Sequence, residues 1–344
     1  MSKEFREFLR KVGSGTNTSK SLTRSEAALA TEMMLQGVAT PAQIGAFMIA
    51  HRIKRPTSDE LAGMLDAYNH LGSKIPAIAS GKKVLVLSSP YDGRSKTAPL
   101  SPATALVLAA ADVPVLLHGG DRMPTKEGLP LIDIWEALGI NWRNLTIAQL
   151  QTSLVKQNLS FVYLPEHFPL AQSLVPYRDQ IGKRPPFATL ELMWSPYEGE
   201  QMLVSGFVHP PTETHMREAF AMHGITEFAT VKGWEGSIDL ARSRTNIIGI
   251  NRGEHFERVI LSAAKHGFGS QDPTIASAEN IAQQIKSALT GEPSEYLNSL
   301  LWNCGFYFWL YGLDPDIPTA ITHAQTLINS GLVSQKLQTV QALT

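Results

Sequence analysis

The chain has 344 residues, of which 43% are apolar, and its 30 Lys and Arg side chains against 31 Asp and Glu give a formal net charge of -1. This length suffices for two domains or for one large α/β domain with an appendage, and the balanced charge argues against a globally basic nucleic-acid binder. The single cysteine, Cys304, excludes an internal disulfide and a multi-cysteine zinc site.

The N-terminal segment predicts a small helical domain over residues 1–72. Its apolar residues recur at helical spacing with no strand pattern between them. Thr23 followed by Glu26 is a capping-box pattern, and Pro41 after Thr40 is typical of a first helical turn. The first residues are charged and lack the apolar region of a signal peptide, and no apolar run approaches the roughly 18 residues of a membrane span. We therefore expect a cytoplasmic protein without membrane partners.

The segment 83–139 alternates strand, loop and helix twice. Apolar runs at 84–87 and 113–117 predict strands, and the Ala- and Leu-rich stretch 101–111 between them predicts a helix. Such alternation builds a parallel sheet, and ligands of open α/β sheets bind at the carboxyl ends of the strands. The polar loops after both strands are therefore expected to form one wall of a binding site.

The rest of the chain continues the α/β pattern. We expect strands over 159–164, 201–208, 227–232, 246–251 and 257–261, and helices over 146–157, 212–223, 277–290, 293–311, 317–330 and on to Leu343. The Pro-rich stretch 165–196 predicts short helices that pack back on the N-terminal helices. The predicted fold is α/β: the helical domain precedes a large domain, residues 73–164 and 197–344, with a central, mostly parallel sheet.

Several segments resemble the anthranilate phosphoribosyltransferase family, within the class II nucleoside phosphoribosyltransferases. They read LTRSEAALATEMMLQGVATPAQIGAFMIAHRIKRPTSDELAGML, ATALVLAAADVPVLLHG and ATVKGWEGSIDLARS, and the resemblance extends over about the whole chain. It implies a hinge between the two domains and a homodimer formed through the helical domain. It also implies transfer of a phosphoribosyl group from PRPP (phosphoribosyl pyrophosphate) to anthranilate, with magnesium, in tryptophan biosynthesis.

The phosphate-binding motifs depart from the family pattern. Where the family has Gly-Thr-Gly-Gly-Asp, this chain has Ser88, Ser89, Pro90, Tyr91 and Asp92. Glycines let backbone amides approach a phosphate, and proline has no amide hydrogen to donate. Of two further motifs, Asn-x-Ser-Thr and Lys-His-Gly-Asn, the chain retains Ser101 and the pair His118-Gly119.

The magnesium motif is also altered. The family's adjacent Asp-Glu pair corresponds to Ile238-Asp239, so that Asp239, with Glu235 nearby, is the remaining candidate metal site. Magnesium prefers several hard oxygen ligands in octahedral geometry, and this set is weaker. Arg184 matches the arginine on the acceptor side of the family's site.

The run Pro90-Tyr91-Asp92-Gly93-Arg94 is similar to a TrpD-like paralogue branch of the family, which implies nucleic-acid binding. The predicted ligand- and phosphate-binding residues all lie in or beside the strand-end loops: Ser88, Tyr91, Asp92, Gly93, Arg94, Lys96, Ser101, His118, Gly119, Arg122 and Lys126. Arg94 and Lys96 are either phosphate ligands or solvated loop charges. Tyr91 either stacks on a base or packs on its own loop, and His118 is either a ligand contact or a structural histidine.

Two functions are compatible with these residues. The favoured hypothesis is a protein with an altered PRPP site that binds a phosphorylated molecule or a single-stranded nucleic acid in the cleft between the lobes. The alternative is a working pentosyltransferase that moves phosphoribose from PRPP to anthranilate or a related aromatic acceptor. Losing the amide cradle and one metal carboxylate would each slow such a transfer by about 10²-fold or more, which is the reason for the preference.

Overall fold

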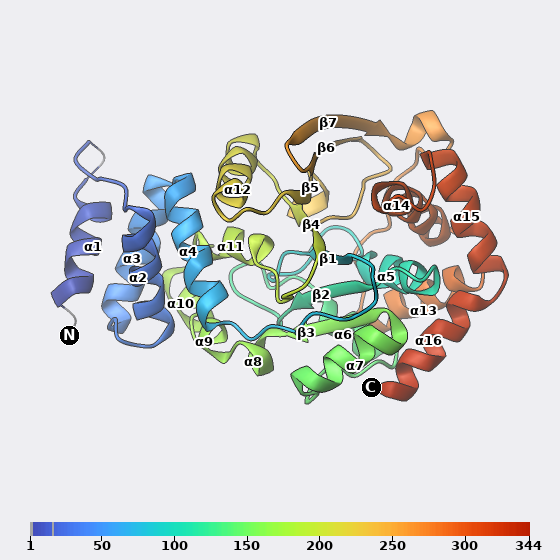
Figure 1. Ribbon diagram of the computed structural model, residues 1–344, viewed down its shortest axis with the longest axis horizontal. Coiled ribbons are helices and arrows are strands. Elements are labelled where there is room, and N and C mark those ends of the chain that lie inside the picture. Colours follow the sequence, from blue (N-terminus) through green and yellow to red (C-terminus); the bar gives the residue numbers. More distant parts are fainter. Residues whose placement is uncertain (1–2, 16) are drawn as a thin grey trace.

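The fold is seen in a computed structural model that describes residues 3–15 and 17–344. A helical block that contains the N-terminus lies beside a larger α/β part (Figure 1). The block holds the four expected helices: α1 (Lys3–Gly13), α2 (Arg24–Leu35), α3 (Pro41–Lys54) and α4 (Ser58–Leu71). Each of the last three begins with a capping box, from Thr23, Thr40 and Thr57, so local sequence sets where these helices start.

The α/β part is built on a seven-stranded sheet with the order β3-β2-β1-β4-β5-β6-β7. Its strands are β1 (Val84–Ser88), β2 (Val115–Gly119), β3 (Leu159–Tyr163), β4 (Gln201–Gly206), β5 (Glu227–Val231), β6 (Thr245–Arg252) and β7 (His255–Ser262). β1 to β5 pair in parallel, and β6 and β7 add an antiparallel edge. The predicted α/β fold with a mostly parallel sheet is therefore confirmed.

Helices cover this sheet. They are α5 (Ser101–Ala110), α6 (Leu131–Ala137), α7 (Ile147–Gln157), α12 (Pro210–Met222), α13 (Ala278–Leu289), α14 (Glu295–Tyr311), α15 (Ile317–Asn329) and α16 (Leu332–Leu343). α5 is buried along almost its whole length, because it packs on β2 and β3 and is covered by α14, α15 and α16. α12 begins two residues earlier than predicted, since Pro210 and Pro211 are compatible with its first turn.

The Pro-rich stretch forms four short helices: α8 (Leu164–His167), α9 (Pro169–Gln172), α10 (Val175–Ile181) and α11 (Phe187–Met193). α10 contacts α3, and α11 contacts α4 together with β1 and β4. The stretch therefore lies between the helical block and the sheet (Figure 1).

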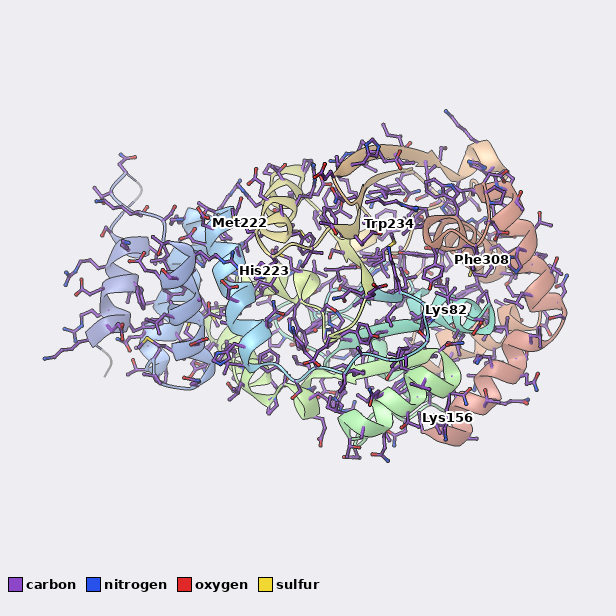
Figure 2. The ribbon with its side chains drawn as sticks, viewed as in Figure 1. Lys82, Lys156, Met222, His223, Trp234 and Phe308 are labelled. Carbon is purple, nitrogen blue, oxygen red and sulfur yellow. The ribbon has the colours of Figure 1, made fainter. Side chains whose placement is uncertain are left out.

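The helical block also contacts the α/β part directly, through α4 and α12. The imidazole Nε2 of His223 lies 2.9 Å from the carbonyl oxygen of Ala62, and Arg24 donates to the carbonyl oxygen of Met222 at 3.0 Å. Met222 and His223 sit at this junction in Figure 2. Within the described residues, no helix is both long enough and apolar enough to cross a lipid bilayer.

Candidate functional site

The candidate site lies at one edge of the sheet, where β1, β2, β4 and β5 end. Because these strands are parallel, the loops that follow them meet at that edge. Ser88, the last residue of β1, is in register with His118 on β2 and with Ser205 on β4. The structure thus brings together the loops that the sequence predicts to form the site.

The loop after β1 turns back sharply at Tyr91 and Asp92. The Gly93 amide donates to the Pro90 carbonyl at 3.1 Å, and Gly93 has a φ of +73°. A Cβ at Gly93 would lie 2.5 Å from the backbone of Gly128, so only glycine fits this approach of the two loops. The turn places Tyr91 inside the protein and Arg94 toward the loop after β5.

Tyr91 and His118 form a buried polar chain that ends at Ser88. The Tyr91 hydroxyl bonds to Nδ1 of His118, and Nε2 of His118 lies 3.0 Å from the Ser88 hydroxyl. Burial lowers the pKa of His118 to about 3 and raises the pKa of Tyr91 well above its ordinary value. The ring of Tyr91 is buried against the ring of His118 on β2, with 5.4 Å between the ring centroids, so it packs inside the fold but not on its own loop. His118 is hydrogen-bonded inside the fold.

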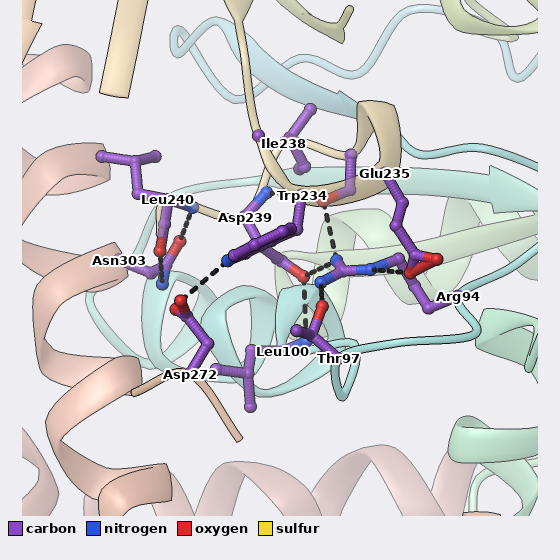
Figure 3. Close-up of polar contacts among 12 residues, drawn as sticks. Arg94, Thr97, Leu100, Trp234, Glu235, Ile238, Asp239, Leu240, Asp272 and Asn303 are labelled. Carbon is purple, nitrogen blue, oxygen red and sulfur yellow. Dashed lines mark hydrogen bonds and ion pairs between the residues drawn. The ribbon is translucent and has the colours of Figure 1, made fainter. Parts of the chain in front are cut away.

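Arg94 joins the loop after β1 to the loop after β5 (Figure 3). Its Nη1 donates to Asp239 Oδ2 at 2.8 Å and to the Ser237 hydroxyl at 2.7 Å. Its Nε donates to Glu235 Oε2 at 3.2 Å, and its Nη2 donates to the Thr97 hydroxyl. The side chain of Arg94 is only 4% exposed, so Arg94 is not a solvated loop charge.

Glu235 is the most heavily bonded carboxylate of this cluster. It accepts from the backbone amide and hydroxyl of Ser95 and from the Lys96 amide, and Lys126 Nζ lies 3.2 Å away. Burial would raise the pKa of Glu235, but Lys126 and the hydrogen bonds from Ser95 and Lys96 lower it to about 2. Glu235 therefore stays ionised and holds the loop after β1 in place.

The carboxylates predicted as a remnant magnesium site do not fit a metal ion in this arrangement. Asp239 accepts from Arg94 and from the Leu100 amide at 3.1 Å, while Glu235 accepts from Arg94 and the Ser95 segment. Within residues 3–15 and 17–344, no group of three or more His, Cys, Asp or Glu is placed to hold a metal. The positive charge next to these two carboxylates comes from the side chains of Arg94 and Lys126.

A very small cavity lies beside Arg94. It has a volume of about 10 Å³, roughly the room for one water molecule. Ser89 and Ser101 line it, and the hydroxyl oxygens of both are buried with no hydrogen-bond partner. This is the place where the family resemblance puts the phosphate-binding loop, and it is almost closed here.

A much larger cleft of about 770 Å³ opens between the helical block and the same sheet edge. Arg52, Arg55, Arg184, His209 and His215 contribute basic side chains to it, and no Asp or Glu is among the described residues that line it. Its apolar walls come from Ile53, Pro56, Pro185, Pro186, Phe207, Val208, Pro210 and Pro211. The cleft is suited to an anion with an apolar or aromatic body.

Arg184 connects this cleft to the loop after β1, because its Nε lies 3.3 Å from Asp92 Oδ2. Arg184 was predicted from the sequence, whereas Arg52 and Arg55 were not. These two lie at the C-terminal end of α3, in the run HRIKRP, whose cationic residues could have been the signal.

The remaining predicted residues lie apart from the cleft. Lys96 is exposed, and Gly119 ends β2 next to the ring of Phe161. Arg122 is exposed and donates to the Glu127 carbonyl at 2.9 Å and to Asp133 at 3.4 Å. It lines a second hollow of about 710 Å³, which Arg94, Ser95, Asp133 and Glu136 also line.

Comparisons with known protein families agree with this architecture. Residues 6–72 match the helical bundle domain of a glycosyl transferase family, and residues 92–333 match the α/β domain of the same family. The anthranilate phosphoribosyltransferase of Lactiplantibacillus plantarum is 31% identical over 89% of both chains. That of Chromobacterium violaceum is 27% identical over 90% of both.

Solved structures give the same fold. The anthranilate phosphoribosyltransferase of Thermus thermophilus matches with a TM-score of 0.80 at 19% identity, over 99% of both chains. A structure of the Saccharomyces cerevisiae enzyme in complex with PRPP and Mg matches with a TM-score of 0.84 at 14% identity, over 100% of this chain and 98% of that one. The relatives named here are phosphoribosyltransferases, so the comparisons favour phosphoribosyl transfer over the nucleic-acid binding that the sequence motifs favoured.

Proposed function

Because the chain belongs to the glycosyl transferase family of the anthranilate phosphoribosyltransferases, we propose that it transfers phosphoribose from PRPP to anthranilate or a related aromatic acceptor. The observation that carries the proposal is the cleft of about 770 Å³ between the helical block and the sheet edge. It has cationic side chains, apolar walls and no lining carboxylate among the described residues. It lies at the sheet edge where ligands of such folds bind.

The acceptor would bind through its carboxylate and its ring. Arg184 lies at the boundary between the cleft and the loop after β1, and a guanidinium can hold a carboxylate through two parallel hydrogen bonds. Phe207 and the flanking prolines offer an apolar surface to an aromatic ring. Arg52 and Arg55 give the cleft a positive potential that attracts anions.

In the reaction, a bond forms between the acceptor nitrogen and C1 of the ribose, and the bond from C1 to the diphosphate oxygen breaks. The diphosphate leaves with the electron pair, and the nitrogen releases a proton. Such transfers depend on positioning and on stabilising the charge of the leaving group. Arg94 is the cation that lines the small cavity, and a diphosphate bound there would accept hydrogen bonds from Arg94 and from the hydroxyls of Ser89 and Ser101.

A second candidate is binding of a single-stranded nucleic acid, or of another phosphorylated ligand, without transfer. The specific observation in its favour is the ion pair between Arg94 and Asp239, beside which the cavity next to Ser89 is almost closed. Phosphate groups of a strand would then contact the cleft of about 770 Å³ and not the closed cavity. The net charge of -1 argues against tight nonspecific binding of this kind.

The test combines an activity assay with two titrations. Purified protein is mixed with PRPP and anthranilate, and the loss of anthranilate and the release of diphosphate are followed. Calorimetric titrations with PRPP, and with single-stranded DNA at two salt concentrations, run in parallel. Turnover supports transfer, whereas DNA binding that weakens steeply with salt and no PRPP signal would replace transfer by the second candidate.

Arg184 provides the matched variant for this assay. Replacing Arg184 by Ala removes the acceptor-side guanidinium, so we expect the KM for anthranilate to rise by about 10-fold or more, with a smaller change in kcat. Arg10→Ala, on an exposed face of α1, is the control and should leave both constants unchanged. An unchanged KM in Arg184→Ala would place the acceptor elsewhere.

A further inference from the structure

We propose that Arg94 takes the place of a divalent metal ion in this chain, so that its phosphate-bearing ligand is bound without magnesium. The identity of that ligand rests on the proposed function. The exclusion of the metal rests only on the geometry around Arg94, Asp239 and Glu235, and it is tested separately.

The guanidinium of Arg94 lies between the two carboxylates that the sequence predicts as metal ligands. Nη1 is 2.8 Å from Asp239 Oδ2, and Nε is 3.2 Å from Glu235 Oε2. Figure 3 shows the side chain spanning the two acids. A planar guanidinium presents several donors in fixed directions, so one side chain can bridge two acids as a metal ion would.

Three of the four carboxylate oxygens of Asp239 and Glu235 already accept hydrogen bonds. Asp239 Oδ2 accepts from Arg94 and from the Leu100 amide, and both oxygens of Glu235 accept from Ser95. Magnesium requires oxygens at about 2.0–2.1 Å in near-octahedral geometry. Recruiting them would break the contacts that hold the loop after β1.

The charge balance leads to the same conclusion. Arg94 and Lys126 supply two positive charges against the two carboxylates of Asp239 and Glu235. Before any phosphate ligand binds, a divalent cation would add two positive charges to these four groups without a counter-charge, in a place where Arg94 is only 4% exposed. Burying unbalanced charge is strongly unfavourable, so Arg94 and a metal ion exclude each other.

Arg94 also has the surroundings needed to bind phosphate. The unpartnered hydroxyls of Ser89 and Ser101 line the small cavity next to it. The cavity has room for about one water molecule, so a phosphate group enters only when the loop after β1 moves outward. It would then meet hydroxyl donors and a guanidinium, and charge-assisted hydrogen bonds of this kind are strong. The positive charge that a metal would bring is therefore part of the chain.

The first experiment measures Mn²⁺ binding by electron paramagnetic resonance, with Mn²⁺ as a probe for a magnesium site. We expect no specific binding by the wild-type protein. Arg94→Ala frees the carboxylates and should bind one Mn²⁺, and the double variant Arg94→Ala/Asp239→Asn should lose it. Arg10→Ala should behave as wild type. The inference would be overturned if the wild-type protein bound one Mn²⁺ and Asp239→Asn abolished that binding. This comparison does not depend on whether Arg94→Ala folds.

The second experiment titrates the wild-type protein with PRPP in excess magnesium and in EDTA. We expect dissociation constants that agree within about threefold. PRPP binding that is lost in EDTA would overturn the inference while leaving the proposed function in place. Failure to bind PRPP in both buffers would count against the proposed function, and the Mn²⁺ measurement would then decide the inference alone.

Discussion

At the residue scale, Arg94 is the side chain that joins the loop after β1 to the loop after β5. It is buried, and it pairs with Asp239 and Glu235 across two loops. Arg94→Ala would leave a buried carboxylate without its partner, so we expect the free energy of unfolding to fall by about 3–5 kcal/mol. Urea denaturation followed by circular dichroism measures this change.

Arg10→Ala is the matched control, because Arg10 pairs with Glu7 at the surface, where both side chains are more than half exposed. Removing such a pair should cost about 0–1 kcal/mol. Equal losses in the two variants would mean that the buried cluster does not stabilise the fold.

Glu60 gives a second prediction at this scale, on pH dependence. It is fully buried at the start of α4, 2.7 Å from Lys54 Nζ and 3.5 Å from His51 Nε2. Burial would raise the pKa of Glu60, but His51, Lys54 and the Thr57 amide lower it from 4.5 to about 2. Its contribution to stability is therefore present above pH 4.5 and is lost as the pH falls toward 2.

Unfolding measured across this range should show a loss of about 3 kcal/mol attributable to Glu60. Glu60→Gln should be less stable at neutral pH and should show a shallower decline with acid. Glu7→Gln, at an exposed position of α1, should keep the wild-type slope. If the free energy of unfolding fell equally with acid in the wild type, Glu60→Gln and Glu7→Gln, the loss could not be attributed to Glu60.

At the element scale, the contact between α2 and α4 requires a glycine. A Cβ at Gly63 would lie 2.0 Å from the Arg24 carbonyl oxygen and 2.9 Å from Ala27 Cβ. We expect Gly63→Ala to force the two helices apart and to lower the free energy of unfolding by about 1–3 kcal/mol. Thermal unfolding would report the change.

Gly45 in α3 is the matched control, since a Cβ there would lie 3.6 Å from Ile181, an ordinary contact distance. Alanine favours the helix interior over glycine by about 0.5–1 kcal/mol, so Gly45→Ala should be neutral or stabilising. A stable Gly63→Ala variant would mean that α2 and α4 can shift at little cost.

At the scale of the whole molecule, the family resemblance implies a homodimer through the helical domain. Leu29 on α2 and Val38 after it leave apolar surface there, with 38% and 50% of each exposed. We expect sedimentation equilibrium to give a dimer, and Leu29→Glu/Val38→Lys to weaken it by about tenfold or more, because charge in an apolar contact is costly.

Val155→Lys is the control for this experiment. Val155 is 57% exposed on α7, in the α/β part, away from the helical block. It should leave the association unchanged. Dissociation caused by Val155→Lys, with no effect of the helical substitutions, would place the interface on the α/β part instead.

The sequence by itself determined the order of the elements. Apolar spacing, capping boxes and prolines are local signals that depend on neighbours along the chain. The predicted bounds agree with the structure to within two residues, whereas α6 and the short helices α8 to α11 were expected without bounds. Which loops meet at the sheet edge also followed, since parallel strands place their carboxyl ends together.

Only the tertiary structure decided how the side chains of those loops are used. Arg94 and Asp239 are 145 residues apart, and nothing local to either of them predicts that they pair. Tyr91 could have faced a ligand, but its hydroxyl is hydrogen-bonded to His118 inside the fold. The cationic cleft likewise needs Arg52 from α3 beside Arg184. The direction of a loop side chain is set by the partners that packing brings within reach, and for these residues those partners come from distant parts of the chain.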